Sequence, residues 1–314
     1  MIYHNFSELV HNVSNPSHKK KVVVVAAHDE HTLEAVFKAK NNDIIEPILV
    51  GDKLRTTEIL EKLHFHLKEQ NIIHVSDDQS AALKAVELIR DNKADFIMKG
   101  KIQTADLLKA VVNKENGLGM GRVMSHVVLH EIPTYHKLLA VTDGGMVINP
   151  TIEQKKQIIE NAVSVYKSLG YTCPKVAVLC AIEKINPKMP ETVDAYKLKM
   201  MNQNGEIKDC IVEGPISYDL TMSTESAKIK GFVSPVTGDA DILIVPNLTT
   251  GNILGKSLVY SASAKMAGFI VGAQVPIVLT SRGSSAEEKY LSLVLSAAAT
   301  VKSTENKHLR GVPV

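Results

Sequence analysis

An arginine flanked by serines and followed by two glutamates has the clearest chemical content in this sequence. Ser281, Arg282 and Gly283 follow an apolar run, and Glu287 and Glu288 come shortly after. The guanidinium of Arg282 stays protonated, and its planar set of five N–H donors matches the oxygens of carboxylate or phosphate. A helical pattern begins after Gly283, and backbone N–H groups at the start of a helix also attract anions. The segment therefore predicts an anion-binding site with a carboxylate nearby.

The two glutamates have more than one interpretation. Ser284 with Glu287, and Ser285 with Glu288, each fit the capping box Ser-x-x-Glu, in which two side chains satisfy backbone N–H groups at the start of a helix. A glutamate placed against a substrate could instead act as a general base. The spacing alone leaves both roles open for either residue.

Two further segments join a strand-like run to a helix, which is where open parallel sheets bind ligands. Lys99 and Gly100 lead to Thr104, which is also a suitable N-cap residue, so binding and capping both remain open. The second segment contains Gly251, then Gly255-Lys256-Ser257. A P-loop needs four residues between its first glycine and the Gly-Lys pair, whereas three separate these glycines. The spacing argues against a nucleoside triphosphatase. The small residues of this segment could instead allow close packing of a helix.

Asp143 and the histidines give weaker signals. Asp143 precedes two glycines and is either a turn former or a site residue. His126 and His130 fall near a predicted strand, as do several of the twelve histidines, but no His-x-x-x-His or His-Glu-x-x-His array occurs. We therefore predict no metal site.

These segments lie in a chain that alternates short β-branched runs with helical periodicity. The expected strands are residues 22–27, 45–50, 72–75, 96–98, 123–129, 138–141, 176–179, 242–245 and 275–279. Helices are expected near residues 33–37, 56–67, 82–89, 104–112, 151–168, 191–201 and 219–230, after 250 and from 284. Continuous apolar strands between helices are typical of a parallel sheet covered on both faces, so the predicted fold class is α/β.

Composition limits the function classes. A chain of 314 residues favours two domains. The net charge of +2, the absence of Trp and an aromatic content of 4% give no support to nucleic-acid or membrane-surface binding. Three cysteines without metal-type spacing predict neither a disulfide framework nor a zinc site and fit a reducing cytoplasm. We expect no signal peptide and no membrane span, because no window approaches 18 uninterrupted apolar residues.

Several blocks, taken in order, resemble the phosphate acetyl- and butyryltransferase family over residues 20–300. They are Lys99-Gly100-Lys101 with Thr104-Ala105-Asp106; Arg122 and Ser125 before Thr142-Asp143; Asp219 after Glu213-Gly214-Pro215; residues 234–241 running into Pro246-Asn247 and Gly251-Asn252; and Ser281-Arg282-Gly283. Their co-occurrence is highly specific. The chain length and the Thr-Asp-x-x-Met form of the middle block look more like the butyryl than the acetyl branch.

The resemblance implies two α/β domains with a central cleft, like those of isocitrate and isopropylmalate dehydrogenases. By analogy, residues 1–130 with 268–314 form domain I, which carries the Ser-Arg-Gly segment, and residues 131–267 form domain II. It also implies a homodimer or larger homo-oligomer. The implied ligands are CoA, acyl-CoA, acyl phosphate and inorganic phosphate, with CoA as a substrate and no tightly bound cofactor.

The family's site residues transfer to individual positions. The resemblance makes Arg282 the catalytic arginine, Ser281 its neighbouring serine and Glu288 the acidic base. Glu287 would then cap the helix with Ser284. The residues expected to bind CoA, the acyl group or phosphate are Arg122, Ser125, Lys99, Gly100, Thr104, Asp143, Asn247, Thr250, Gly251, Asn252 and Gly283.

These assignments suggest that the acyl group is transferred directly between phosphate and CoA. A free thiol with a pKa near 8.5 is only a few per cent ionised at neutral pH, so a base at the sulfur of CoA accelerates its attack by roughly 100- to 10,000-fold. We expect Glu288 to be that base, Ser281 to donate to the oxyanion, and Arg282 with Arg122 to hold the departing phosphate. No acyl-enzyme is needed, and the sequence has no convincing Cys-His or Ser-His pair.

The sequence departs from the family pattern in two places, and three alternative functions remain open. No basic segment with a CoA-binding arginine is found before residue 95, so the residues that hold the CoA phosphates are unassigned. Gly144 replaces a cysteine found in some acetyl-branch members. The alternatives are a phosphate acetyltransferase, a catalytically altered CoA-binding protein of the same fold, and an NAD- or metal-dependent dehydrogenase. The last would need clustered aspartates, which the sequence lacks. The sequence does not determine the preferred acyl chain.

Overall fold

The computed structural model describes residues 2–15, 17–281 and 283–300. Its strands are β1 (Lys20–Val25), β2 (Ile45–Gly51), β3 (Ile72–His74), β4 (Phe96–Lys99), β5 (Ser125–Glu131), β6 (Leu139–Thr142), β7 (Lys175–Leu179), β8 (Ile211–Ile216), β9 (Ile242–Ile244), β10 (Lys265–Val271) and β11 (Ile277–Val278). Its α-helices are α1 (Phe6–Val13), α2 (Glu30–Asn41), α3 (Lys53–Lys62), α4 (Asp78–Arg90), α5 (Thr104–Val111), α6 (Ile152–Ser168), α7 (Pro190–Gln203), α8 (Tyr218–Met222), α9 (Thr224–Lys230), α10 (Leu248–Ser261) and α11 (Ala286–Ala299). A short 3₁₀ helix covers Glu69–Asn71.

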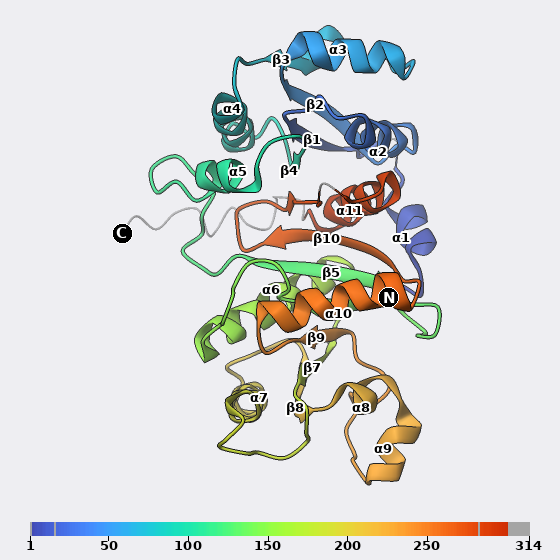
Figure 1. The fold of residues 1–314 in the computed structure, drawn as a ribbon, viewed down its shortest axis with the longest axis vertical. Helices are drawn as coiled ribbons and strands as arrows, with labels where there is room; N and C mark the ends of the chain where they lie inside the picture. The colour runs from blue at the N-terminus through green and yellow to red at the C-terminus, as the bar shows by residue number, and fades with distance from the viewer. Residues whose placement is uncertain (1, 16, 282, 301–314) are drawn as a thin grey trace.

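The strands form one continuous sheet of eleven strands in the order β3-β2-β1-β4-β11-β10-β5-β6-β9-β7-β8. Figure 1 shows it running along the long axis of the molecule. Both outer parts are parallel, as predicted, but β5 and β10 pair antiparallel with each other and with β6 and β11. The apolar pattern did not reveal this reversal, because buried parallel and buried antiparallel strands are equally apolar.

The chain enters the second half of the sheet through β5 and returns to the first half through β10. As a result β11 lies beside β4, and α11 packs on β10 and on α2, which is far from it in sequence. In Figure 1 the red helix α11 lies among the blue and green elements. The segment that follows β11 therefore belongs spatially with the first hundred residues.

Three apolar clusters hold the layers together. One face of the sheet is covered along its length by α1, α2, α11, α6 and α7. The other face carries two separate clusters, one under α4 and α5 and one under α8, α9 and α10. Between these two clusters lies the middle of β5 and β10. The gap in helix cover is where a ligand can reach the sheet.

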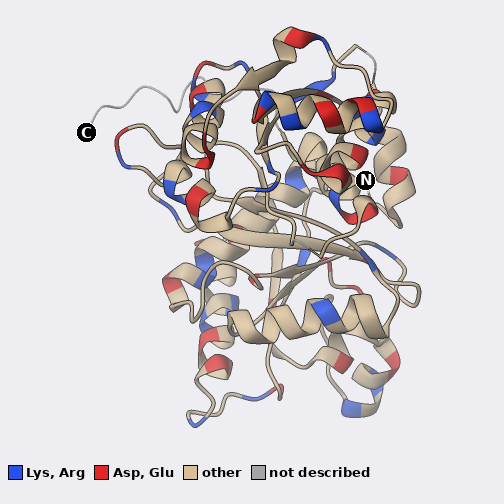
Figure 2. Ribbon diagram, turned by 45° about the horizontal axis from the view of Figure 1, so that its top comes forward, with Lys and Arg blue, Asp and Glu red and all other residues tan. Residues whose placement is uncertain are grey.

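Charged residues of both signs alternate along the helices in Figure 2, and the central strands are mostly uncharged. Among the described residues, no helix is long and apolar enough to cross a membrane.

All nine predicted strands are present, with bounds that shift by at most two residues. Two strands and one helix were missed, namely β8, β10 and α1. The helix expected near residues 219–230 is two helices, because Ser223 ends α8 and caps α9.

Candidate active site

A pocket of about 340 Å³, here called the central pocket, lies over the middle of β5 and β10. One wall comes from α10 and the loop after β6, and the other from α5, the segment after β11 and α11. Five of the predicted site residues line it, namely Thr104, Gly251, Asn252, Ser281 and Glu288. The structure thus brings together three stretches that are far apart in sequence.

The predicted base stands at the start of α11. Ser285 is the N-cap, and its side chain accepts a hydrogen bond from the backbone N–H of Glu288 at 3.1 Å. The Glu288 carboxylate accepts a hydrogen bond from the Ser284 hydroxyl at 2.6 Å. Burial raises the pKa of Glu288 above its ordinary value, and the bond from Ser284 and the charge of Lys289 oppose this only in part. A half-buried carboxylate with a raised pKa is suited to accept a proton.

Glu287 has a different environment, and the predicted capping pair with Ser284 is wrong. Its side chain is 56% exposed and lies 3.7 Å from the ammonium group of Lys265. The Ser284 hydroxyl bonds Glu288 instead, and the helix is capped by Ser285. Two Ser-x-x-Glu patterns overlap here by one residue, and the sequence does not show which serine begins the helix.

Ser281 lies on the exposed part of the central pocket, in a turn between β11 and α11. Its hydroxyl accepts a hydrogen bond from the backbone N–H of Gly283 at 3.3 Å, and its carbonyl accepts one from that of Ser284 at 3.1 Å. Gly283 is exposed, with open space around its Cα. Arg282, the predicted catalytic arginine, lies outside the described residues, so its role stays a prediction.

Asp143 is buried and organises the loop after β6. Its carboxylate accepts hydrogen bonds from four backbone N–H groups at 2.8–3.1 Å, those of His126, Gly145, Met146 and Val147. The side chain is not among those that line the central pocket. Of the two roles left open by the sequence, this geometry fits the turn former.

Gly144 and Gly251 allow the loop after β6 to touch the start of α10. A Cβ on Gly144 would lie 2.9 Å from the carbonyl carbon of Gly251, and one on Gly251 would lie 2.8 Å from the Cα of Gly144. Asn252 donates to the Gly144 carbonyl at 3.4 Å. Asn247 is the N-cap of α10 and accepts hydrogen bonds from the backbone N–H and the hydroxyl of Thr250. A cysteine side chain has no room at position 144.

The segment after β4 is held by backbone contacts. A Cβ on Gly100 would lie 2.4 Å from the carbonyl oxygen of Ala26, so β1 and the loop after β4 touch at this glycine. Lys99 is buried and donates to the Gly100 carbonyl at 3.2 Å. Ser125 is fully buried, and its hydroxyl accepts a hydrogen bond from Asn161 at 3.0 Å. None of the three lines the central pocket.

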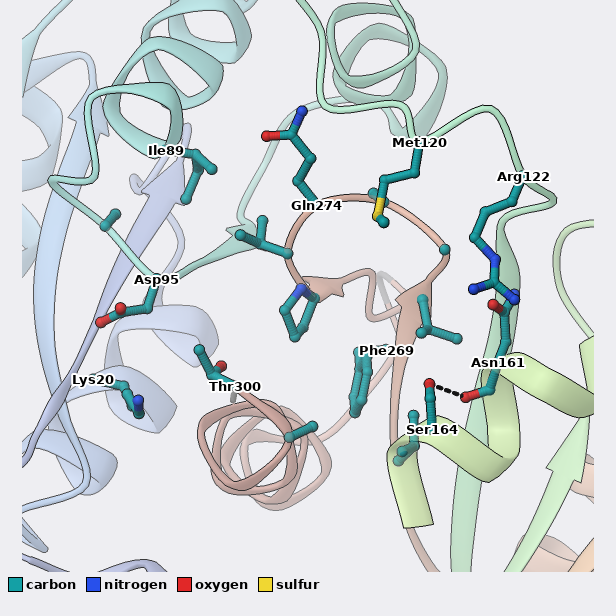
Figure 3. A pocket seen from close by; sticks show the side chains of 18 of the residues that line it. Lys20, Ile89, Asp95, Met120, Arg122, Asn161, Ser164, Phe269, Gln274 and Thr300 are labelled. Atoms are coloured by element: carbon teal, nitrogen blue, oxygen red, sulfur yellow. Dashed lines mark hydrogen bonds between the residues drawn. The ribbon is translucent and has the colours of Figure 1, made fainter. Parts of the chain in front are cut away.

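Arg122 also lies apart from the central pocket. It lines a second cavity of about 700 Å³, shown in Figure 3, where it lies beside Asn161. This cavity is also lined by Lys20 and Asp95, at the amino ends of parallel strands, whereas Ser281 follows the carboxyl end of β11. The Arg122 guanidinium is 3.4 Å from the carboxylate of Glu160. The structure therefore does not bring Arg122 together with Ser281 and Glu288, and its phosphate-binding role stays a prediction.

The floor of the central pocket was not predicted. It consists of three cross-strand pairs of β5 and β10, which are His126 with Ile270, Val128 with Gly268, and His130 with Met266. Alternate residues of a strand share a face, so the spacing 126, 128, 130 was the signal available in the sequence. It could not be used, because no pattern showed that this face lacks a covering helix.

Burial disfavours the charged form of both floor histidines. Burial lowers the pKa of His126, and it lowers that of His130 to about 4. Among the described residues, no group of three or more His, Cys, Asp or Glu side chains is placed to hold a metal ion. Glu288 is therefore the pocket carboxylate whose raised pKa suits proton transfer, and its role as the base stays a prediction.

Known proteins that are similar to this chain are acyltransferases. The chain matches the family described as Phosphate acetyl/butaryl transferase over residues 5–82 and 76–297. It is similar to the phosphate acetyltransferase of Thermotoga maritima, with 47% identity over 278 residues, 88% of this chain and 94% of that one. It is also similar to the phosphate butyryltransferase of Clostridium acetobutylicum, with 43% identity over 293 residues, 93% of this chain and 97% of that one.

Solved structures of related proteins are also similar to this chain. A branched-chain phosphotransacylase from Enterococcus faecalis V583 matches with a TM-score of 0.78 and 35% identity, covering 90% of this chain and 99% of that one. A 4-hydroxythreonine-4-phosphate dehydrogenase from Burkholderia phymatum shares the fold alone, with a TM-score of 0.56 and 16% identity over 91% of this chain and 99% of that one. The predicted dehydrogenase-like α/β fold is confirmed. The chain belongs to the phosphate acetyl/butyryl transferase family of acyltransferases.

Proposed function

We propose that the protein catalyses the reversible reaction acyl-CoA + phosphate = acyl phosphate + CoA, in a ternary complex. The observation that carries this proposal is the Glu288 carboxylate. It is half-buried, its pKa is raised, and it lines the central pocket together with Ser281. A thiol in this pocket would meet a base that favours taking its proton.

In the direction of acyl-CoA synthesis, the Glu288 carboxylate removes the proton from the thiol of CoA. The thiolate attacks the carbonyl carbon of the acyl phosphate, and the new C–S bond forms as the oxygen becomes negatively charged. Ser281 donates a hydrogen bond to this oxyanion, an interaction typically worth about 3 to 4 kcal/mol. The C–O bond to phosphate then breaks, and Arg282 holds the leaving phosphate, with Arg122 as a second candidate.

A short acyl group longer than acetyl is our preferred substrate. The names of the butyryltransferase of Clostridium acetobutylicum and the branched-chain phosphotransacylase of Enterococcus faecalis support it. The acetyltransferase of Thermotoga maritima, at 47% identity, keeps phosphate acetyltransferase as the second candidate.

Three further expectations belong to this proposal. CoA serves as a substrate, not a bound cofactor. Residues 1–130 with 268–314, and residues 131–267, act as two domains around the central pocket. The protein forms a homodimer or a larger homo-oligomer in the cytoplasm. Three apolar side chains with 78–96% exposure support a contact surface, namely Ile229, Val233 and Tyr260.

The test is a direct assay of the purified protein. Butyryl-CoA and inorganic phosphate are incubated with it, and we expect release of free thiol that depends on phosphate, with butyryl phosphate trapped by hydroxylamine. Thiol release without phosphate would indicate a thioesterase. Binding of CoA without either product would support the catalytically altered CoA-binding protein instead.

A further inference from the structure

Glu288 stands in the first turn of α11, behind a loop that is exposed. Ser281 and Gly283 lie in this loop, and the hydrogen bonds described for them stay within it or reach only the next residue, Ser284. The direction in which the Glu288 carboxylate points therefore depends on the contacts that hold the helix after it.

The next residue in the helix, Lys289, is buried and paired. Its side chain is 6% exposed, and its ammonium group lies 3.0 Å from the carboxylate of Asp29 and 3.2 Å from the hydroxyl of Thr32. Asp29 is the N-cap of α2, and it also accepts a hydrogen bond from the backbone N–H of Thr32 at 2.9 Å. An ion pair thus fastens the first turns of α11 to the start of α2.

This ion pair and the pocket lie on different sides of α11. An α-helix turns by about 100° per residue, so Lys289 and Glu288 point in different directions. Glu288 and Ser292 are one turn apart and both line the central pocket, and the Ser292 hydroxyl accepts a hydrogen bond from the backbone N–H of Gly268 at 3.1 Å. A rotation of α11 that turned Glu288 away from the pocket would separate Lys289 from Asp29.

Stability alone does not account for a lysine at this position. A positive charge near the start of a helix opposes the helix dipole, and a buried ion pair is often no more stabilising than apolar side chains of similar size. A lysine adds a directional contact and a charge next to Glu288. Burial raises the pKa of Glu288, and the bond from Ser284 and then the charge of Lys289 oppose this rise.

We propose that Lys289 is a positioning residue for Glu288: its ion pair with Asp29 holds α11 in the rotation that directs the Glu288 carboxylate into the central pocket, and places a positive charge beside that carboxylate. This inference rests on the proposed function and deepens it. Lys289 does not line the pocket, so it acts on the reaction only through Glu288.

Other ionisable groups around Glu288 come from the elements that form the pocket or pack on α11. They are Glu287 in α11, Lys265 in β10, His126 and His130 in β5, Lys256 in α10, and Asp29 before α2. Among the described residues, α1 and α6 also pack on α11 but contribute no side chain to the central pocket. A variant at Lys289 or Asp29 leaves the other groups in place.

The test compares Lys289→Met with Asp29→Asn in the synthesis of butyryl-CoA from butyryl phosphate and CoA, followed against pH. Lys289→Met removes the ion pair at similar side-chain length. It should lower kcat about 10- to 100-fold, as small misplacements of reacting groups do, with little change in KM for CoA. Asp29→Asn keeps an acceptor oxygen and should lower kcat less.

The acid limb of kcat/KM should move in opposite directions in the two variants. Lys289→Met removes a positive charge beside Glu288, which raises the pKa of this base and moves the limb to higher pH. Asp29→Asn leaves the charge of Lys289 unopposed, which lowers the pKa of Glu288 and moves the limb to lower pH. A contact with a purely structural role would produce neither shift.

Tyr290→Phe is the matched control. Tyr290 joins α11 to the other end of α2, where its hydroxyl accepts a hydrogen bond from the Asn42 side chain at 2.7 Å. The substitution removes this bond between the same two helices and leaves the charge at neutral pH unchanged. Its melting temperature should fall, whereas its acid limb should coincide with that of the wild type.

Titration of the Glu288 side-chain carboxyl by NMR makes the same comparison without catalysis. Opposite shifts in the two variants support the proposal, and Asp29→Asn decides it if Lys289→Met does not fold. A fall in kcat without these shifts makes the ion pair merely structural, which overturns the proposal and leaves the proposed function intact. A wild type that forms no butyryl-CoA overturns the proposed function, and the NMR titration then still shows whether Lys289 acts on Glu288.

Discussion

Two carboxylates near the central pocket, Asp143 and Glu288, have opposite environments. Asp143 accepts four backbone N–H bonds and holds the loop after β6 in place. Glu288 accepts one bond from the hydroxyl of Ser284, and burial raises its pKa. A carboxylate that holds four backbone N–H groups is committed to positioning a loop, whereas one that is desolvated and sparsely bonded can exchange a proton. Hydrogen bonding, not residue type, therefore separates the structural acid from the candidate base.

The largest effect is expected from removing the base. Glu288→Gln keeps the shape of the side chain but cannot accept the proton of CoA, so the rate of acyl-CoA formation should fall about 100- to 10,000-fold. Initial rates with butyryl phosphate and CoA measure this. Glu287→Gln is the matched control and should stay near wild type, since Glu287 is exposed beside Lys265. A large loss in Glu287→Gln with near-normal turnover in Glu288→Gln would reverse the assignment.

Asp143→Asn should act on stability first. One carboxylate oxygen accepts from His126, Gly145 and Met146 and the other from Val147. The amide keeps one acceptor oxygen and turns an NH2 donor toward at least one of these backbone N–H groups, and leaving such a group unpaired in a buried site costs about 1 to 3 kcal/mol. Chemical denaturation should show this loss in the free energy of unfolding. Activity per folded molecule should fall much less than in Glu288→Gln. A variant that is fully stable but inactive would instead make Asp143 a site residue.

Ser284→Ala should give the smallest change. The hydroxyl stabilises the ionised form of Glu288, so its removal raises the pKa of this carboxylate further. The base works when ionised, and kcat/KM for acyl-CoA synthesis falls as pH drops through this pKa. The acid limb should therefore move to higher pH in the variant. One hydrogen bond contributes about 1 kcal/mol, so the rate at neutral pH should change less than tenfold. If the acid limb of the pH profile moved to lower pH in this variant, Ser284 would not be the group that stabilises the ionised form of Glu288.

Much of the fold could be predicted, because alternating apolar runs and helices show an α/β sheet directly. The missed strands have a physical reason. β8 contains Gly214-Pro215 and β10 contains Gly268, which break the β-branched pattern that reveals a strand. The antiparallel pair in the middle of the sheet was missed for two reasons: β10 was not recognised as a strand, and the apolar pattern of a buried strand such as β5 does not reveal its direction.

The site was predictable only in part. Resemblance to a family chose Glu288, and local spacing alone gave no preference between it and Glu287. The same resemblance nominated Ser125 and Asn247, whose side chains have structural hydrogen bonds here. The floor of the central pocket, which includes His126 and His130, was not predicted, because its significance depends on burial and on the gap between the helices that cover the sheet. Those properties arise from tertiary packing and not from neighbouring residues in the sequence.

The return of the chain through β10 and β11 has a consequence for synthesis of the protein. Until residues 265–278 are made, β4 and β5 each present an unpaired edge, and such edges promote aggregation. Translation at about 5 to 20 residues per second leaves these edges open for roughly 10 to 30 s. The nascent chain is therefore prone to association through these edges until β10 and β11 are made, and a truncation before β10 would leave neither half of the sheet complete.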